Sequence, residues 1–318
     1  MRAPVLALVL SLCLPSAALA ATVAEATAWL VAKDARAAPA ITALLKAQPR
    51  SADVHVLHAR LLLQQREPED AIDAAERAVG LGPAHAQAHY WLGNALGQRI
   101  GQVGMIRQAA MAPKLREAFE RALELDPEIH EARLNLIEFY LQAPSFAGGS
   151  VDAAKAHAAQ LARRDPPRGH FAAGRLAMHA KDLPAAAKAY GAAYRARPDN
   201  ANFRMAAGTT WQATEQWDAA FALYQAWTKE DPAAAGAQYQ LGRTAALSGQ
   251  FLPEGEAALR RYLALPLAPG QPPHHHAWYR LGQVQAHAGD KAAARVSFQN
   301  ALKGEPGNAE FKAALSAL

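Results

Sequence analysis

The sequence predicts an all-α protein, an α-solenoid in which pairs of helices stack on one another. Three observations support this prediction. The composition is rich in alanine, the residue with the highest intrinsic helix propensity. Apolar residues recur at helical spacing along the chain. Prolines that can end a helix pair also recur, as at Pro198 and Pro232, which lie 34 residues apart. Because 51% of the 318 residues are hydrophobic, the chain can bury a continuous core.

The clearest repeat unit runs from Trp278 to Pro306. Its key positions are Trp278, Leu281, Gly282, Gly289, Ala294, Phe298, Ala301 and Pro306. The first part forms one apolar stripe at helical spacing and the later part forms a second. Gly282 lets the second helix approach the first closely, and Gly289 with Asp290 supplies the turn between them. Two helices of this length cannot bury both stripes alone, so the unit needs neighbours of its own kind.

These positions fit a W-x2-L-G spacing followed by small, aromatic, small and proline positions, and the segment resembles the tetratricopeptide repeat family. Gln285 stands where the family pattern usually has tyrosine. The resemblance implies a right-handed α-solenoid of helix-turn-helix repeats with an extended concave face. It covers essentially the whole chain after the N-terminal segment.

The same period divides the chain into one array rather than several domains. Residues 52–307 hold about seven repeats, with insertions near 97–113 and 142–150. Each insertion falls at the turn between the two helices of its unit. Residues 21–51 are expected to form a degenerate or half repeat, and residues 308–318 a C-terminal capping helix.

The first 20 residues predict export. Arg2 precedes an apolar run over residues 3–14, and Ala18-Leu19-Ala20 forms a small-residue cleavage site, so residues 1–20 are expected to be a signal peptide cleaved after Ala20. The run is shorter than the ~20 apolar residues that a membrane span needs, so no stable membrane insertion is expected. Cys13 is the only cysteine and leaves with this peptide. The mature chain is therefore expected to be periplasmic or secreted.

Charge and motifs argue against several functions. The formal net charge is only +5 and no block of lysine or arginine occurs, so nucleic-acid binding is not expected. The chain has no glycine-rich phosphate loop, no His-Glu-x-x-His motif and no serine in a recognisable nucleophile elbow. We therefore expect a non-enzymatic protein with no catalytic residues and no cofactor.

Histidines are the remaining candidates for chemistry. His55 with His58, and His85 with His89, each share one helix face, and residues 274–276 are three consecutive histidines. Half-buried helix contacts explain the two pairs, and a solvated helix start explains the three consecutive histidines. Because spaced histidines without an acidic or cysteine partner rarely complete a metal site, no metal is expected.

In tetratricopeptide repeats the first helix of each pair lines the concave face, so the resemblance assigns candidate partner-binding positions. In each unit, the position equivalent to Trp278 is called the Trp-type position. The residue after it and the residue four further on share an exposed stripe. Unit by unit, these pairs are Val56 and Arg60, Tyr90 and Asn94, Leu134 and Glu138, Phe171 and Arg175, Met205 and Thr209, Tyr239 and Arg243, and Tyr279 and Gln283. The first member is always apolar or aromatic and the second polar or charged, which suits an extended polypeptide. Alternatively, the apolar member packs against the neighbouring helix.

The preferred function is that of an exported scaffold that binds a protein or peptide in its concave groove, in cell-envelope assembly. The alternative is a binding module for a small or polymeric envelope ligand, such as a peptidoglycan fragment. The two insertions form either a lip or second contact patch beside the groove, or merely two lengthened helices with an irregular turn. The sequence indicates neither the identity of the partner nor the oligomeric state.

Overall fold

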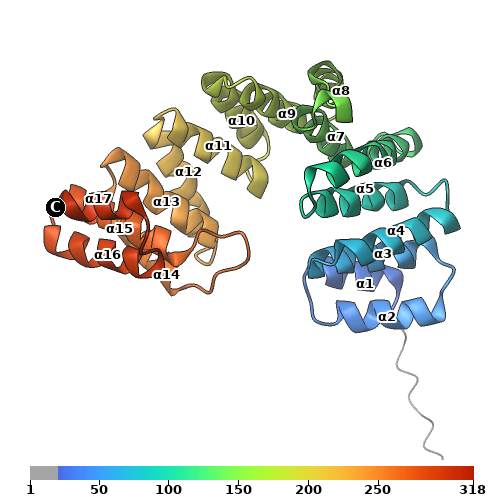
Figure 1. Cartoon of the computed structure of the whole chain (residues 1–318), viewed down its shortest axis with the longest axis horizontal. Helices are drawn as coiled ribbons and strands as arrows, with labels where there is room; N and C mark the ends of the chain where they lie inside the picture. The colour runs from blue at the N-terminus through green and yellow to red at the C-terminus, as the bar shows by residue number, and fades with distance from the viewer. Residues whose placement is uncertain (1–20) are drawn as a thin grey trace, which may run out of the picture. The chain divides into compact units, whose positions relative to one another are not determined.

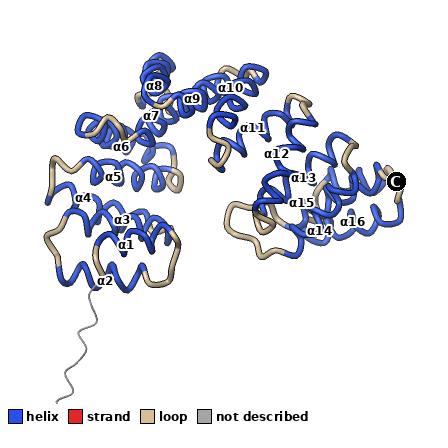
Figure 2. The backbone as a smooth tube through the Cα atoms, turned by 180° about the vertical axis from the view of Figure 1, so that it is seen from behind, coloured by secondary structure: helices blue, strands red, loops and turns tan. Residues whose placement is uncertain are grey.

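The computed structural model describes residues 21–318, and every regular element in this part of the chain is a helix (Figure 1). Figure 2 shows the helices joined by loops and turns, with no strand between residues 21 and 318. The predicted signal peptide, residues 1–20, lies outside the described residues. The all-α fold class is confirmed.

The described chain contains 17 α-helices and one short 3-10 helix, η1. Their bounds are α1 (Val23–Val31), α2 (Ala37–Ala47), α3 (Ala52–Gln65), α4 (Pro68–Leu81), α5 (Ala86–Ile100), α6 (Met105–Leu125), α7 (His130–Gln142), η1 (Ser145–Ala147), α8 (Val151–Arg164), α9 (Pro166–His179), α10 (Leu183–Ala196), α11 (Ala201–Ala213), α12 (Trp217–Glu230), α13 (Ala235–Ser248), α14 (Leu252–Ala264), α15 (His274–His287), α16 (Lys291–Gly304) and α17 (Ala309–Ser316).

Consecutive helices pack as hairpins, as α3 does with α4, α5 with α6, α9 with α10, and α15 with α16. The last of these pairs is the repeat unit that is clearest in the sequence. An added Cβ at Gly282 of α15 would lie 2.5 Å from the Phe298 ring of α16, so glycine is what permits this close approach. The Asp290 side chain accepts a hydrogen bond from the backbone N–H of Ala293 at 2.9 Å and so begins α16 after the predicted turn.

The described residues form two compact units, one ending at Gly149 and the other running from Ser150 to Leu318. The repeat period predicts one continuous array, whereas the boundary between the units falls inside the second insertion. Each unit is an α-solenoid of stacked helices with its own buried core.

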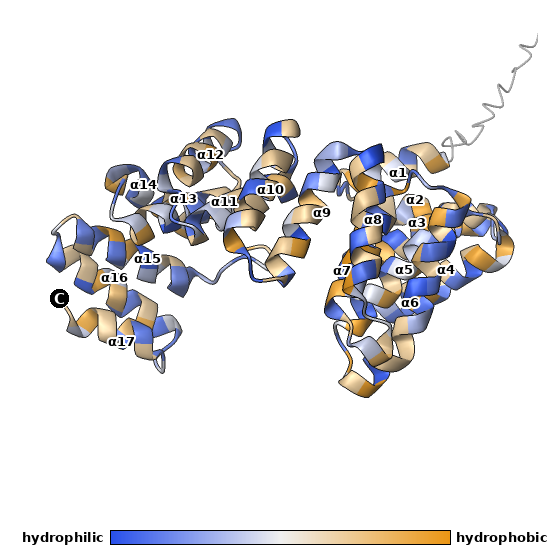
Figure 3. Cartoon of the chain, turned by 90° about the horizontal axis from the view of Figure 1, so that it is seen from above, coloured by the Kyte–Doolittle hydropathy of each residue, from blue (hydrophilic) through white to orange (hydrophobic). Residues whose placement is uncertain are grey.

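Each core consists of side chains from successive helices. In the first unit, Leu30, Ile41 and Val54 belong to one buried cluster that joins α1, α2 and α3. In the second unit, Tyr190 and Tyr224 belong to a cluster that joins α10, α11 and α12. Figure 3 shows apolar and polar residues interspersed along the helices, as expected of helices that bury one face.

The irregular parts of the repeat pattern have defined structures. Residues 21–51 hold two helices, α1 and α2, which pack against each other. The first insertion lengthens α5 to Ile100 and begins α6 at Met105, so most of its residues are helical. At the C-terminus, α17 packs on α16 and buries Phe311 completely. From residue 21 onwards, no helix combines the length and apolar character needed to cross a membrane.

Candidate functional site

Three of the predicted partner-binding side chains are buried in the fold. Val56, Tyr239 and Tyr279 are only 6%, 7% and 5% exposed. The Tyr279 ring stacks on Phe311 with the ring centres 4.7 Å apart, and the Tyr239 ring lies 5.3 Å from that of Tyr262. The expectation that these three residues form an exposed stripe is therefore wrong. They pack against helices of their own unit, as in the alternative interpretation.

The other apolar members of the predicted pairs are half-buried. These are Tyr90, Leu134, Phe171 and Met205. The Phe171 ring of α9 stacks on Phe203 of α11 with a centroid distance of 5.0 Å, so one of its faces is already covered. Only part of each side chain can contact a ligand.

The three arginines of the predicted pairs differ in exposure. Arg175 is exposed, whereas Arg60 and Arg243 are half-buried. The Arg60 guanidinium lies 4.9 Å from the centre of the Trp91 ring, a cation–π contact. The Arg243 guanidinium donates to the side-chain oxygen of Gln212. Burial lowers the pKa of Arg60 and of Arg243 from the usual arginine value.

The uncharged polar members bond mainly within their own helices. The Thr209 hydroxyl donates to the Met205 carbonyl oxygen at 2.7 Å, and the Gln283 amide donates to the Tyr279 hydroxyl at 3.0 Å. The Asn94 amide likewise donates to the backbone carbonyl of its own helix α5. Asn94 also lines a pocket.

A pocket of about 440 Å³ lies in the first unit, among α5, α6, α7 and η1. It is lined by residues between Gly93 and Phe119 and between Asn135 and Ala147, and we call it the insertion pocket. Residues of both insertions line it. Two of the predicted partner-binding residues, Asn94 and Glu138, lie in the same lining.

One side of the insertion pocket is apolar. Leu115 and Phe119 of α6 line it together with Phe139 of α7. Met105 and Phe146, one from each insertion, also line the pocket, and they are 73% and 75% exposed. An apolar pocket bordered by exposed apolar side chains is typical of a surface that another molecule covers.

The remaining lining is rich in amide side chains, with one carboxylate. The amides are those of Asn94, Gln98, Gln108, Asn135 and Gln142. The Asn135 amide nitrogen donates to the Asn94 side-chain oxygen at 3.2 Å, which links α7 to α5. The Gln98 side-chain oxygen is buried and has no hydrogen-bond partner among the described residues. Glu138 is the only titratable residue in the lining, and it accepts a hydrogen bond from Gln142.

Sequence reasoning placed the insertions but missed most of the pocket residues. Gln108 shows how the first insertion is held: its amide nitrogen donates to the carbonyl oxygens of Ile100 at 3.2 Å and Val103 at 2.9 Å. The apolar residues inside both insertions were the available signal. Phe119 and Phe139 lie in regular helices and carried no signal that separated them from ordinary core residues.

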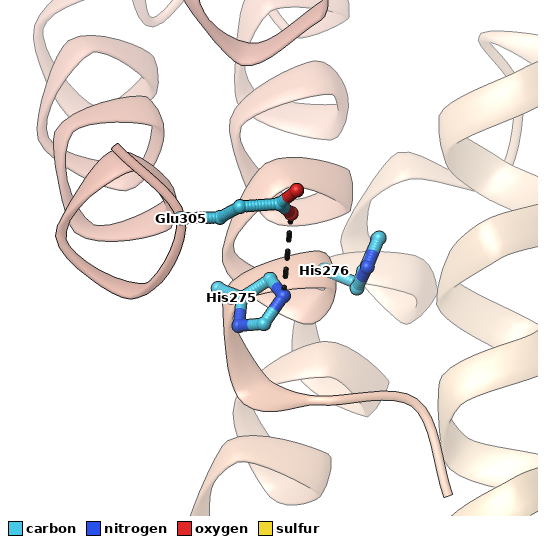
Figure 4. A group of neighbouring side chains, drawn as sticks. All are labelled: His275, His276 and Glu305. Atoms are coloured by element: carbon cyan, nitrogen blue, oxygen red, sulfur yellow. Dashed lines mark ion pairs between the residues drawn. The ribbon is translucent and has the colours of Figure 1, made fainter. Parts of the chain in front are cut away.

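The histidine pairs make structural contacts. A ring nitrogen of His85 lies 2.8 Å from a carboxylate oxygen of Asp53, and the carbonyl oxygen of Pro83 accepts a hydrogen bond from His89 at 2.9 Å. His275 and His276 are different, because the structure brings Glu305 beside them. Their potential ligand atoms all lie within 4.8 Å of one another (Figure 4).

Similarity to known proteins shows the family of the chain. The family model described as tetratricopeptide repeat matches residues 35–83, 56–99, 146–201 and 239–310, together more than half of the chain. A search of curated protein sequences finds no match. The Cut9–Hcn1 hetero-tetramer of the APC/C is similar with a TM-score of 0.54 at 13% identity, over 92% of this chain and 48% of that chain. This likeness concerns the fold alone.

Two other solved structures are similar at lower TM-scores. A tetratricopeptide repeat protein from Parabacteroides merdae ATCC 43184 matches with a TM-score of 0.46 at 12% identity, over 83% of this chain and 97% of that chain. PilW, described as a widely conserved type IV pilus biogenesis factor, matches with a TM-score of 0.47 at 15% identity, over 83% and 98%. On the extent of the family match and on its helix hairpins, this chain belongs to the tetratricopeptide repeat family.

Proposed function

We propose that this chain is an exported, non-enzymatic scaffold that binds a protein or peptide partner, and that the partner is anchored in the insertion pocket. Tetratricopeptide repeats bind protein or peptide partners, and the chain belongs to this family.

The observation that carries the proposal is the convergence of both insertions on one pocket. The insertions depart from the regular repeat at two places about 40 residues apart in the sequence, yet Met105 and Phe146 line the same cavity. The volume of about 440 Å³ lies in the range of specific binding pockets. Simple lengthening of helices would not require the two insertions to share a cavity.

The chemistry of the lining suits a polypeptide. A peptide group offers one N–H donor and one C=O acceptor, and an amide side chain can satisfy both. Gln108 uses both of its amide hydrogens on backbone carbonyl oxygens of the first insertion, whereas Asn94 and Asn135 each give one of their two amide hydrogens to the bonds described above. These two amides, and the side-chain oxygen of Gln98, which has no partner among the described residues, lie beside the apolar wall of the pocket. An extended segment can therefore place an apolar side chain in the cavity while its backbone bonds to the amides.

The exposed apolar residues favour a macromolecular partner over a small one. Met105, Ile106 and Phe146 are 73%, 88% and 75% exposed. A small molecule inside the cavity would leave much of these side chains in water, whereas a polypeptide can cover them. We therefore place a peptidoglycan fragment or another small envelope ligand second.

Export is supported by the sequence of residues 1–20, which has the order of a signal peptide. An envelope role follows from that location. The absence of recognisable catalytic motifs supports a non-enzymatic role. N-terminal sequencing of the protein recovered from the culture medium or the periplasm tests the location, since the proposal expects a first residue of Ala21.

Two neighbouring alanines of α6 allow a matched test of the binding site. Ala109 lines the pocket, whereas Ala110 is exposed and does not line it. A phage-displayed library of random peptides is selected on the wild-type chain, and the enriched peptides are then measured on Ala109→Trp and Ala110→Trp. The proposal expects peptides with apolar residues, which Ala109→Trp no longer binds and Ala110→Trp still binds.

Equal binding by both variants would place the peptide site elsewhere on the chain. Envelope fragments serve as the second arm of the test. If a peptidoglycan fragment raises the melting temperature of the wild type but not of Ala109→Trp, and no peptide is enriched, the small-ligand alternative replaces the proposal.

A further inference from the structure

Three side chains with metal-ligating atoms meet in the second unit, far from the insertion pocket in the sequence. His275 and His276 lie in the first turn of α15, and Glu305 directly follows α16. The His275 ring nitrogen Nε2 lies 3.5 Å from the Glu305 carboxylate, and Figure 4 shows the carboxylate directed toward His275 with His276 alongside. The acidic partner that the sequence seemed to lack is thus Glu305, at the end of the neighbouring helix α16.

We propose that His275, His276 and Glu305 bind a divalent transition-metal ion of the Zn²⁺ type. Two imidazole nitrogens and one carboxylate oxygen are ligands that Zn²⁺ accepts, with water in the remaining position. Zn²⁺ bonds of about 2.0–2.2 Å in tetrahedral geometry place neighbouring ligand atoms about 3.3–3.6 Å apart. One pair already has this separation, and all three ligand atoms lie within 4.8 Å of one another. The widest of the three separations therefore exceeds the tetrahedral value by at most about 1.5 Å.

The third histidine of the stretch is not a ligand. The carbonyl oxygen of Leu265 accepts a hydrogen bond from the His274 ring at 3.2 Å, which commits this ring to the end of α14. The site therefore has two histidines and one carboxylate rather than three histidines.

The surroundings hold the ligands in place. An added Cβ at Gly304 would lie 2.5 Å from the His275 Cβ, so a glycine permits the close approach of α15 to the end of α16. The Asn308 amide donates to the Glu305 carboxylate at 3.1 Å and orients it, as partners outside the ligand set commonly do in metal sites. The Phe311 ring lies against both imidazoles, with centroid distances of 6.3 Å and 5.7 Å.

Charges around the site favour a cation. The charged groups near His276 are the carboxylates of Glu305 and Glu310 and the guanidinium of Arg280. Negative groups therefore outnumber positive ones around the site. The N-terminus of α15 carries a partial positive charge that opposes metal binding. The end of α16, with its partial negative charge, lies on the other side of the site and offsets it.

A bound ion would join the last repeat to the C-terminal helix. Two ligands belong to α15, the third follows α16, and Asn308, which holds the third, is the N-cap of α17. Terminal repeats need a capping element for stability, and the metal would tie that element down. The role is structural and does not depend on the proposed function.

Isothermal titration of the full mature chain with Zn²⁺, after removal of bound metal with a chelator, tests the proposal. We expect one equivalent of Zn²⁺ to bind to the wild type. His276→Ala and the isosteric Glu305→Gln should each weaken this binding at least about tenfold, a change of about 1.4 kcal/mol. The control is His179→Ala on α9, an exposed histidine of the same unit, which should bind as the wild type does.

Two results would overturn the proposal. The first is a wild-type chain that takes up no stoichiometric Zn²⁺. The second is a Glu305→Gln variant that binds Zn²⁺ as tightly as His179→Ala does, because the ion would then lie elsewhere. Circular dichroism shows that each variant is folded, and imidazole NMR signals identify the histidines that respond to Zn²⁺, which should include His276 and exclude His274.

Discussion

Gly255, in the first turn of α14, is the position at which one methyl group should most clearly separate two packed helices. An added Cβ at Gly255 would lie 2.2 Å from the Cβ of Ala245 on α13. Ala245 is fully buried, and a methyl group has no rotamer by which it can move away. In Gly255→Ala the two carbons must separate from 2.2 Å to at least 3.4 Å, an ordinary contact distance, and the helix backbones must supply that movement.

The expected magnitude combines two opposing effects. Overpacking a well-packed core costs about 1–3 kcal/mol, and the upper end applies because no side chain can rotate away. Alanine is favoured over glycine in a helix by about 1 kcal/mol, which offsets part of this cost. Gly255→Ala should therefore lower the free energy of unfolding of the second unit by about 2 kcal/mol. For a unit of this size, the melting temperature should fall by about 4–8 °C.

Gly236→Ala on α13 is the matched control in the same unit. The nearest atom to its added Cβ is the terminal methyl carbon of Met205 at 3.3 Å, the flexible end of a side chain that can move. Its stability should stay the same or rise by up to about 1 kcal/mol. Calorimetry of both variants measures the difference. If Gly255→Ala melts at or above Gly236→Ala, the close packing of α13 on α14 is not what the structure indicates.

Three further predictions concern pH and the pocket. Although burial opposes the ionisation of Asp165, hydrogen bonds from the Arg168 backbone and side chain lower its pKa. Asp165→Asn should therefore lower the free energy of unfolding by about 1–2 kcal/mol at neutral pH. This difference from the wild type should shrink as the pH falls below the ordinary value of 3.8 toward the lowered pKa. Burial, and to a smaller extent the charge of His55, lower the pKa of His58, so protonation of His58 favours the unfolded state. The stability of the protein should therefore decline as the pH falls below 6.5. Thermal melts at several pH values should show a smaller decline for His58→Gln. Phe146→Ser should change stability by less than about 0.5 kcal/mol yet weaken binding of the selected peptides about tenfold or more in a titration.

The helix hairpins could be predicted because they rest on local rules. Trp278 and Leu281 lie on one helix face and Pro306 ends the unit. The structure has α15 over His274–His287, which includes Trp278 and Leu281, and α16 over Lys291–Gly304, which ends before Pro306. The close contact of Gly282 with Phe298 was predictable too, because only glycine leaves room for a second helix at that distance.

The burial of the predicted partner-binding residues could not be deduced in the same way. Helical spacing gives the face of a helix but not the size of the side chains that neighbouring helices place against it. Tyr279 is covered by Phe311, a residue of the C-terminal helix that follows 32 positions later. Such contacts depend on how successive repeats stack, which the repeat pattern does not specify.

The structure also explains why many units have a polar residue at the Trp-type position. In five units the carbonyl oxygen six residues earlier, always of a proline, accepts a hydrogen bond from this side chain. The pairs are His55 with Pro49, His89 with Pro83, Arg133 with Pro127, Arg204 with Pro198, and Gln238 with Pro232. The side chain thus fastens the helix to the turn before it, so a polar residue there stabilises the hairpin junction.

Site-specific photocrosslinking at Phe146 shows directly whether a polypeptide partner occupies the insertion pocket. A photoreactive phenylalanine analogue replaces Phe146 in the source cell, and mass spectrometry identifies the crosslinked segment. We expect a crosslink to a polypeptide segment that has an apolar residue at the site of attachment. This crosslink should be lost when Ala109→Trp fills the pocket and retained in Ala110→Trp. A crosslink of equal yield in both variants, or none to any polypeptide, would contradict occupation of the pocket by such a partner.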